Sequence, residues 1–232
     1  MTPSGNTCLT CRVKHCSILK PCSLETLAAI SRFKANYGFK KGDIIIKEGQ
    51  ISDGVYFIKR GVVKIEKNGP NGRNFIINIC GAGNIIGHRG MQGNTIQKST
   101  VVALSEVTCC FIPVNFFNEI LKNASDLEKQ ITEDYLCQLE QLEKKSISLA
   151  YKSVKEKVAE VILVLATIYN YEPKKQSFSI DLSRQDLADL TGATKEQVSS
   201  VLKEFERNSI IRYSGKHFYS LDIGTLKTIA EA

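Results

Sequence analysis

The sequence predicts an α+β fold with an N-terminal β-roll, a long central helix and a C-terminal winged helix-turn-helix. Most of the 16 glycines lie between residues 38 and 93, separated by short β-branched runs that are typical of a β domain with many turns. After Pro113 there is no glycine until Gly192, and apolar residues recur every three or four positions, which indicates helices. Near the C-terminus, two short capped helices precede a hairpin pattern.

Composition narrows the class of protein. The 232 residues are 43% hydrophobic and 24% charged, which is ordinary for one large or two small globular domains. The longest apolar stretch, at about residues 161–169, is shorter than the ~20 residues of a membrane helix. No secretory signal follows residues 1–6, so we expect a cytoplasmic protein without a membrane partner. The net charge of +7 comes mainly from the first 70 residues and does not by itself mark a nucleic-acid-binding segment.

The pattern divides the chain into four segments. Residues 1–24 form a cysteine-rich segment, 25–122 a β-roll sensor domain, 123–150 a dimerisation helix and 151–232 a DNA-binding winged helix-turn-helix domain. The strands expected in the β-roll are 43–47, 55–59, 62–67, 74–80, 100–104 and 107–112, with a hairpin connection at 68–72.

Ser125-x-x-Glu128 reads as a capping box that opens the long helix, which is expected to end near residue 150. Its apolar stripe has near-heptad spacing and charged flanks. Such a stripe packs either on the protein's own barrel or against a second copy, and the spacing favours the dimer. The stripe consists of Leu127, Ile131, Tyr135, Leu139, Leu142, Ser146 and Leu149.

A helix at about 153–169 and a strand at 178–182 lead to the helix-turn-helix. Ser183 caps a helix over 184–190, and Thr194-x-x-Gln197 caps a second helix that runs to about residue 208. Ala188 and Gly192 are the small residues that a tight crossing of two helices requires. The inward face of the second helix is Val198, Val201, Leu202 and Phe205, and residues 210–221 read as the hairpin wing.

The outward face of the second helix suits the major groove of DNA. Glu196 can accept a hydrogen bond from cytosine N4, and Ser199 and Ser200 can contact bases without strong preference. Basic side chains nearby are suited to phosphates, which supply affinity and register. They are Arg184, Lys195, Lys203 and Lys216. Because this region carries little excess charge, two copies are needed for firm binding.

The order of these segments resembles the Crp/Fnr superfamily of bacterial transcription regulators, as do the sequences of residues 183–188 and 194–200. The resemblance implies a cyclic-nucleotide-binding-like jelly roll, a homodimer, double-stranded DNA and RNA polymerase as partners, and no enzymatic activity. Glu196 and Ser199 match the family's recognition helix. Ser200 stands where an arginine usually reads guanine, and a serine cannot make that bidentate contact.

The same resemblance makes a cyclic nucleotide an improbable ligand. The region that would hold it contains Gly87, His88, Lys98 and Ser99. His88 replaces the family's acidic residue, which leaves it an ordinary surface or pocket residue. Lys98 lies where an arginine is expected and offers only a point charge to a phosphate.

The N-terminal cysteines are the stronger sign of sensing. Cys8, Cys11, Cys16 and Cys22 are crowded into one short segment, and thiolates hold both zinc and iron–sulfur clusters. Oxygen-sensing family members carry a [4Fe–4S] cluster, and Cys16-x5-Cys22 with Cys110-x-Ile-Pro resembles their ligand pattern. Cys8 and Cys11 do not keep the usual spacing. Zinc with Cys or His15 ligands, and no cofactor with reduced thiols or a redox switch, stay open. Cys80, Cys109 and Cys137 are expected to be buried apolar residues.

Cluster assembly or loss would then alter packing beside the long helix and so change dimer geometry. The two recognition helices must lie ~34 Å apart to reach successive major grooves.

Two other classes of protein compete with the interpretation as a DNA-binding regulator. An electron carrier using the cysteines would leave residues 183–221 unexplained, and the chain has no Gly-rich dinucleotide loop and no Ser/His/Asp set. A winged helix that binds protein instead of DNA would bind without a steep salt dependence.

Overall fold

The computed structural model describes residues 7–69, 74–91, 95–172, 178–179 and 182–232. The chain forms two compact units. One comprises Met1–Lys67 with Ile79–Glu140, and the other comprises Asn68–Asn78 with Gln141–Ala232. Among the helices of the described residues, none has the length and apolar character needed to cross a bilayer.

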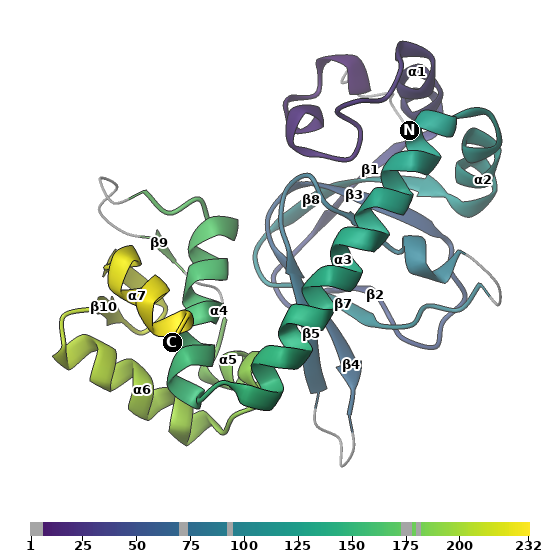
Figure 1. Ribbon diagram of the computed structural model, residues 1–232. Coiled ribbons are helices and arrows are strands. Elements are labelled where there is room, and N and C mark those ends of the chain that lie inside the picture. Colours follow the sequence, from purple (N-terminus) through teal and green to yellow (C-terminus); the bar gives the residue numbers. More distant parts are fainter. Residues whose placement is uncertain (1–6, 70–73, 92–94, 173–177, 180–181) are drawn as a thin grey trace. The chain divides into compact units, whose positions relative to one another are not determined.

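The predicted β-roll consists of two four-stranded antiparallel sheets and belongs to the first unit, apart from Asn68–Asn78, which are counted with the second (Figure 1). The strands of one sheet, in spatial order, are β1 (Ala35–Phe39), β8 (Val107–Pro113), β3 (Gly54–Arg60) and β6 (Ile85–Ile86). Those of the other are β2 (Ile44–Ile46), β7 (Thr100–Ala103), β4 (Val63–Asn68) and β5 (Asn74–Cys80). Buried residues of both sheets, such as Ile58 and Val101, share one core. All six predicted strands are confirmed, and β1 and β6 were not predicted. The middle of the predicted 68–72 connection lies outside the described residues.

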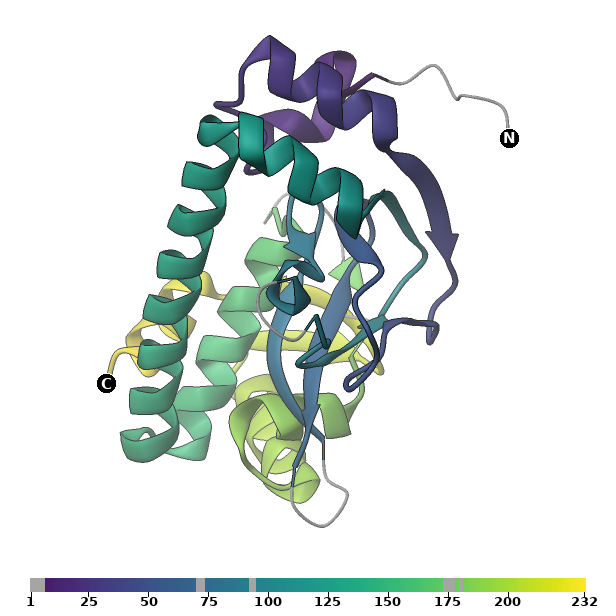
Figure 2. The same ribbon diagram turned by 90° about the vertical axis from the view of Figure 1, so that its right-hand side faces the viewer.

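Short helices cover one end of this roll. They are η1 (Cys8–Thr10), η2 (Arg12–Cys16), α1 (Leu24–Phe33) and α2 (Val114–Asn123). A further short helix, η4 (His88–Gly90), follows β6. Figure 2 shows α1, α2 and the start of the long helix α3 (Ser125–Tyr151) together at the end of the strands. Leu27, Phe117 and Leu127 of these three helices are buried in one hydrophobic cluster.

The long helix begins differently from the prediction. Ser125 is already its first helical residue, because α2 ends at Asn123 and Ala124 alone separates the two helices. The predicted capping box at Ser125 is therefore wrong. Asp126 joins the helix to α1 instead: its carboxylate accepts hydrogen bonds from the Ser23 amide at 2.6 Å and the Thr26 hydroxyl at 2.8 Å. These bonds lower the pKa of Asp126.

The predicted apolar stripe of α3 is buried only at its start. Leu127 and Ile131 are buried in the core of the same unit, as the alternative of packing on the protein's own barrel requires. Leu139 and Leu142 of the stripe are exposed, together with Leu136 and Ile147, which the prediction did not include. Leu136, Leu139, Leu142 and Ile147 have exposed fractions of 62%, 52%, 48% and 60%. We call these four residues the exposed α3 stripe. Cys137 beside them is exposed, so its predicted burial is wrong, because its turn of the helix faces away from the roll core.

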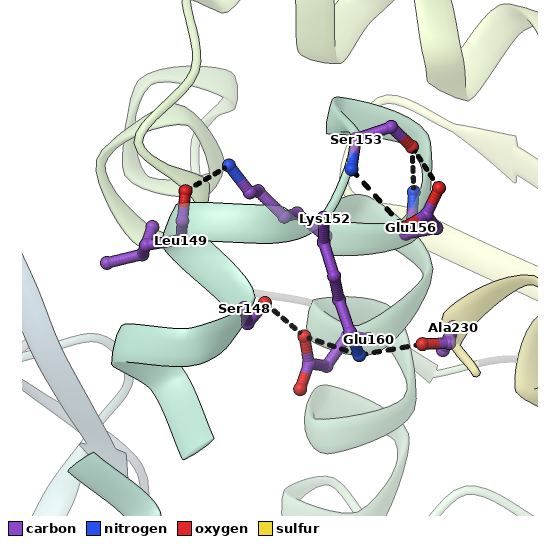
Figure 3. A network of polar contacts seen from close by, with 8 residues as sticks. Ser148, Leu149, Lys152, Ser153, Glu156, Glu160 and Ala230 are labelled. Carbon is purple, nitrogen blue, oxygen red and sulfur yellow. Dashed lines mark hydrogen bonds and ion pairs between the residues drawn. The ribbon is translucent and has the colours of Figure 1, made fainter. Parts of the chain in front are cut away.

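In the second unit, α3 joins α4 (Val154–Ile168) at a junction held by polar contacts (Figure 3). The Ser148 hydroxyl donates to the Glu160 carboxylate at 2.6 Å, and the Lys152 ammonium lies 3.5 Å from the same carboxylate. Lys152 also donates to the carbonyl oxygen of Ala230 at 2.7 Å. Ser153 forms a capping box with Glu156 at the start of α4. The junction therefore fastens the last turn of α3 to α4 and to the C-terminal helix α7 (Ile223–Ala230).

The rest of this unit is the predicted winged helix-turn-helix. Its elements are β9 (Phe178–Ser179), α5 (Arg184–Thr191), α6 (Lys195–Arg207), β10 (Ile211–Ser214), β11 (His217–Leu221) and α7 (Ile223–Ala230). The three strands form an antiparallel sheet in the order β10-β11-β9. Residues 180 and 181 of the predicted 178–182 strand lie outside the described residues.

Candidate nucleic-acid interface and sensor sites

Two capping boxes build the helix-turn-helix. The Ser183 hydroxyl accepts from the Asp186 amide at 3.0 Å, and the Asp186 carboxylate accepts from the Ser183 amide at 2.8 Å. Thr194 and Gln197 exchange the same pair of bonds at the start of α6. Gly192 has a φ of 64° in the turn, a conformation that an L side chain rarely adopts. These features confirm the predicted helix boundaries and the turn glycine.

Helix α6 is strongly two-sided. Val198, Leu202 and Phe205 are fully buried, and Val201 is nearly so. On the opposite side, Lys195, Glu196, Ser200 and Lys203 are exposed. Ser199 is partly buried, and its hydroxyl donates to the carbonyl oxygen of Lys195 at 2.8 Å. Four of the side chains predicted to meet bases and phosphates, Lys195, Glu196, Ser200 and Lys203, therefore lie exposed on one helix.

The wing follows directly. Gly215, with a φ of 60°, and Lys216 form the two-residue turn between β10 and β11, and Lys216 is exposed. Arg184, at the first position of α5, extends to this turn. Its Nη2 donates to the carbonyl oxygen of Gly215 at 3.3 Å, and its guanidinium lies 4.8 Å from the ring centroid of Tyr213. Arg184 was predicted only as a phosphate contact, and sequence alone did not indicate its position beside the wing.

Some of the predicted sensor cysteines share a pocket in the first unit. Cys8, Cys11 and Cys110 line it, together with Lys14, Lys34 and Gly83. Cys16 lies at its border, because a Cβ built on Gly83 would be 3.3 Å from the Cys16 sulfur. Cys22 belongs to the hydrophobic cluster, where its thiol donates to the carbonyl oxygen of Ile18 at 3.6 Å. Burial raises the pKa of Cys22 to about 11 and also raises that of Cys110.

The chemistry of this thiol set suits a thiophilic metal or an iron–sulfur cluster. In the arrangement described for residues 7–69 and 95–172, no three Cys, His, Asp or Glu side chains are close enough to hold a metal ion. A bound group would therefore need the thiols to move toward one another. Cys80 and Cys109 are buried in the core between the two sheets, as predicted.

Two residues of the region compared with a nucleotide site, His88 and Gln97, are buried. His88 is only 5% exposed, so its prediction as a surface residue is wrong, and its place in a pocket stays a prediction. Gln97, which the sequence did not single out, is buried beside Gly87 and Gly90 and donates from Nε2 to the Ser52 hydroxyl at 2.9 Å. Lys98 is exposed and Ser99 is partly buried. Gln97 directly precedes Lys98, and this position next to a candidate residue was the one signal the sequence offered for it.

His88 contacts helix α3 instead of solvent. Its ring centroid lies 5.0 Å from that of Tyr135, and its Nε2 lies 3.6 Å from the carboxylate of Asp134. Neither ring nitrogen has a hydrogen-bond partner among the described residues. Burial and the charge of Arg89 lower the pKa of His88 to about 4, and burial raises the pKa of Asp134. His88 is thus neutral at neutral pH and links η4 to α3 by packing.

The fold and this surface define a winged helix-turn-helix protein with a β-roll domain. The family described as "Cyclic nucleotide-binding domain" matches residues 38–124, and the "Crp-like helix-turn-helix domain" matches residues 156–229. Together with the relatives described next, these matches show that the chain belongs to the Crp/Fnr superfamily, whose members are DNA-binding transcription regulators.

Curated relatives span nearly the whole chain. A probable transcriptional activator of Rhizobium leguminosarum bv. viciae is 25% identical over 229 residues, covering 97% of this chain and 93% of the relative. The transcriptional activator protein FnrL of Cereibacter sphaeroides is 23% identical, covering 90% and 85%. The structure of FixK2 from Bradyrhizobium japonicum is 18% identical with a TM-score of 0.76, covering 86% of this chain and 98% of that one, and it supports the fold.

Proposed function

We propose that this chain regulates transcription as a homodimer that inserts the outward face of α6 into the major groove of two DNA half-sites. The observation that carries the proposal is the two-sided α6, which is fully buried at Phe205 and exposed at Glu196 and Ser200. Glu196 accepts from a cytosine amine, and Ser199 and Ser200 contact neighbouring bases. The phosphate contacts come from Lys195, Lys203 and Lys216, and Arg184 lies beside the wing turn that carries Lys216.

The exposed α3 stripe supports the homodimer. Leu136, Leu139, Leu142 and Ile147 are large apolar side chains on one helix, and they are largely exposed in a single copy. Helices with such a face associate through it, because association removes the apolar surface from water. A second copy gives the two-fold arrangement in which recognition helices ~34 Å apart meet successive major grooves. RNA polymerase is the further partner expected of a regulator bound at a promoter.

The cysteine pocket supports a sensing function in the first unit. A [4Fe–4S] cluster is the group we propose for it, with zinc and a thiol switch without cofactor as the alternatives. Cys8, Cys11, Cys16, Cys22 and Cys110 are the candidate ligands, and Cys8, Cys11 and Cys110 already line one pocket. A bound cluster would supply sensitivity to oxygen. The chain itself supplies the thiols and the packing of α1 against α2 and α3.

DNA binding is tested with protein purified without oxygen and a duplex enriched from a random-sequence pool by repeated binding. We expect affinity to fall steeply with salt, with a slope of about −0.9 in log K against log salt for each phosphate contact. Glu196→Ala should retain binding but lose preference at one cytosine position. Failure to enrich any duplex, both with and without oxygen, would exclude the proposal. A flat salt response would favour a protein partner.

The cofactor is tested by iron, sulfide and zinc analysis and by absorption spectra of the same preparation. We expect iron and sulfide in the wild type and their loss in Cys110→Ser. Cys109→Ser is the matched control, because Cys109 is the adjacent buried cysteine of β8 but belongs to the core between the sheets. Zinc without iron would support the zinc alternative, and absence of both metals would support the thiol switch.

A further inference from the structure

Arg184 joins the start of the helix-turn-helix to the tip of the wing. It is the first residue of α5, 31 positions before the glycine whose carbonyl oxygen it contacts at 3.3 Å. Its guanidinium also lies over the Tyr213 ring, at 4.8 Å from the centroid. A planar guanidinium can donate in its plane while stacking through its face, and a lysine ammonium cannot combine the two. Arg184 therefore holds two points of the wing at once.

The aromatic side of this contact is anchored in the core. Tyr213 of β10 stacks on Phe218 of β11, with ring centroids 5.6 Å apart and planes inclined by 24°. Phe218 is 1% exposed. The register of the two strands shifts between Arg212 and Tyr213, so that Tyr213 pairs with Phe218 and leaves Tyr219 as an extra residue. Stacking on the buried Phe218 ring thus fixes the position of the Tyr213 ring in this irregular strand pair, and Arg184 packs on the Tyr213 ring.

We propose that Arg184 is a positioning residue that sets the place of the wing tip, so that Lys216 reaches the DNA backbone only while Arg184 holds the turn. This inference rests on the DNA-binding function proposed above and deepens it. Lys216 directly follows Gly215, whose carbonyl oxygen Arg184 binds. Without this bond and the stacking, the two-residue turn loses its tie to α5, and Lys216 samples positions away from the phosphate.

The alternative is that Arg184 contacts a phosphate independently of the wing. A double-mutant cycle separates the two, using anaerobically purified homodimer and the duplex enriched by the wild type. Lys216→Ala should weaken binding about five- to tenfold and reduce the salt slope by about 0.9 for each copy. If Arg184 acts through the wing, Lys216→Ala has little further effect in an Arg184→Met background. If Arg184 acts independently, the fold reductions in DNA affinity caused by the two single substitutions multiply in the double variant.

Two further variants remove the contact in different ways. Tyr213→Leu removes the ring but keeps the Arg184 charge, so the wing hypothesis expects it to abolish the effect of Lys216→Ala as Arg184→Met does. Arg184→Lys keeps the charge without the planar group and should not restore the coupling. Lys203→Met is the matched control, because Lys203 is an exposed cation on α6. The reduction in DNA affinity that it causes should multiply with the reduction caused by Lys216→Ala. Circular dichroism verifies that each variant is folded.

The inference would be overturned if the reductions in DNA affinity of Arg184→Met and Lys216→Ala multiply, or if Arg184→Lys fully restores the coupling between residues 184 and 216. Either result would leave the DNA-binding function intact. Failure of the wild type to bind any enriched duplex would instead remove the function on which the inference rests. Loss of coupling in Arg184→Met and Tyr213→Leu, but not in Lys203→Met, is the result that supports it.

Discussion

At the residue scale, single side chains at the proposed interface and in the first unit have different physical tasks. Glu196 and Ser200 are exposed and depend on a partner for any energetic effect, whereas His88 is buried and already contributes to the fold. A change at an exposed recognition residue should therefore alter sequence preference with little effect on stability. A change at His88 should alter the dependence of stability on pH.

Ser200→Arg should add a guanine preference to the half-site. An arginine at this exposed position of α6 can donate two hydrogen bonds to guanine O6 and N7, worth about 1–3 kcal/mol of discrimination. Selection from a random duplex pool measures the change. Ser200→Lys is the control for charge, and it should raise affinity for all sequences with less gain at guanine. An unchanged selected sequence in Ser200→Arg would show that residue 200 does not face a base.

Acid should destabilise the first unit through His88. The pKa of His88 is about 4 in the folded chain and about 6.5 when unfolded, so between these values only the unfolded chain is protonated there. The stability contributed by His88 is therefore complete above pH 6.5 and is lost as pH falls toward 4, by up to about 3 kcal/mol. Protonated His88 would face Asp134, Arg89 and Tyr135 in a site with little water.

Urea unfolding at pH 7 and pH 4.5 measures this loss. The carboxylates that titrate in the same range contribute to wild type and variant alike, so the informative quantity is the difference between the two proteins. His88→Gln should lose less stability on acidification than the wild type. His217→Gln, a change at an exposed histidine of β11, should leave the acid response as it is. Equal acid responses of wild type and His88→Gln would contradict the assignment.

At the element scale, local sequence signals explain which elements could be predicted. The strands of the β-roll have β-branched runs between glycines, and α5 and α6 have capping boxes, so their positions follow from short-range chemistry. Helix α2 has no such signal, because Pro113 precedes it without a side-chain cap. Strand β1 contains Asn36 and Gly38 and depends on pairing with β8. Helix α7 was not predicted, although Asp222, which accepts a hydrogen bond from the Thr225 amide, is a typical residue for the start of a helix.

The residues of the candidate site likewise differ in whether local sequence patterns could locate them. The exposed face of α6 follows from helical periodicity, so Lys195, Glu196, Ser200 and Lys203 could be located from the sequence. The contact of Arg184 with the wing turn joins residues 31 positions apart and depends on how the hairpin folds back. The burial of His88 depends likewise on the packing of η4 against α3. Contacts of this kind have no local sequence signal.

The pairing of β3 with β8 leads to a prediction about two glycines. A Cβ on Gly54 would lie 2.1 Å from the carbonyl oxygen of Ile112 and 2.6 Å from the Phe111 ring, whereas a Cβ on Gly38 of β1 would meet nothing within 4 Å. Gly54→Ala should therefore destabilise the chain by about 3 kcal/mol or prevent folding. Gly38→Ala, in the same sheet, should change stability by less than about 1 kcal/mol. Urea unfolding followed by circular dichroism compares them, and equal midpoints would contradict the close approach at Gly54.

At the scale of the whole molecule, α3 takes part in both compact units. Its first turns are held in the first unit by Asp126, Leu127 and Tyr135, through α1, the hydrophobic cluster and η4. Its last turns are held in the second unit by the bonds of Ser148 and Lys152 to Glu160 and Ala230 (Figure 3). Because α3 is continuous and held at both ends, a shift of its axis would act on contacts in both units.

Dimerisation through the exposed α3 stripe is the remaining requirement of this coupling. Leu136→Glu with Leu139→Glu should convert the protein to a monomer, because the two copies would bring four carboxylates together where apolar contacts are expected. Sedimentation velocity measures the mass. Leu24→Glu is the matched control, since Leu24 is a 71% exposed leucine outside α3 and its change should leave the dimer intact.

The monomer keeps an intact α6 but loses the second half-site contact, so its DNA affinity should fall about a hundredfold or more. A double variant that stays dimeric would show that another surface joins the copies, and a monomer that binds DNA as tightly as the wild type would show that one recognition helix is sufficient.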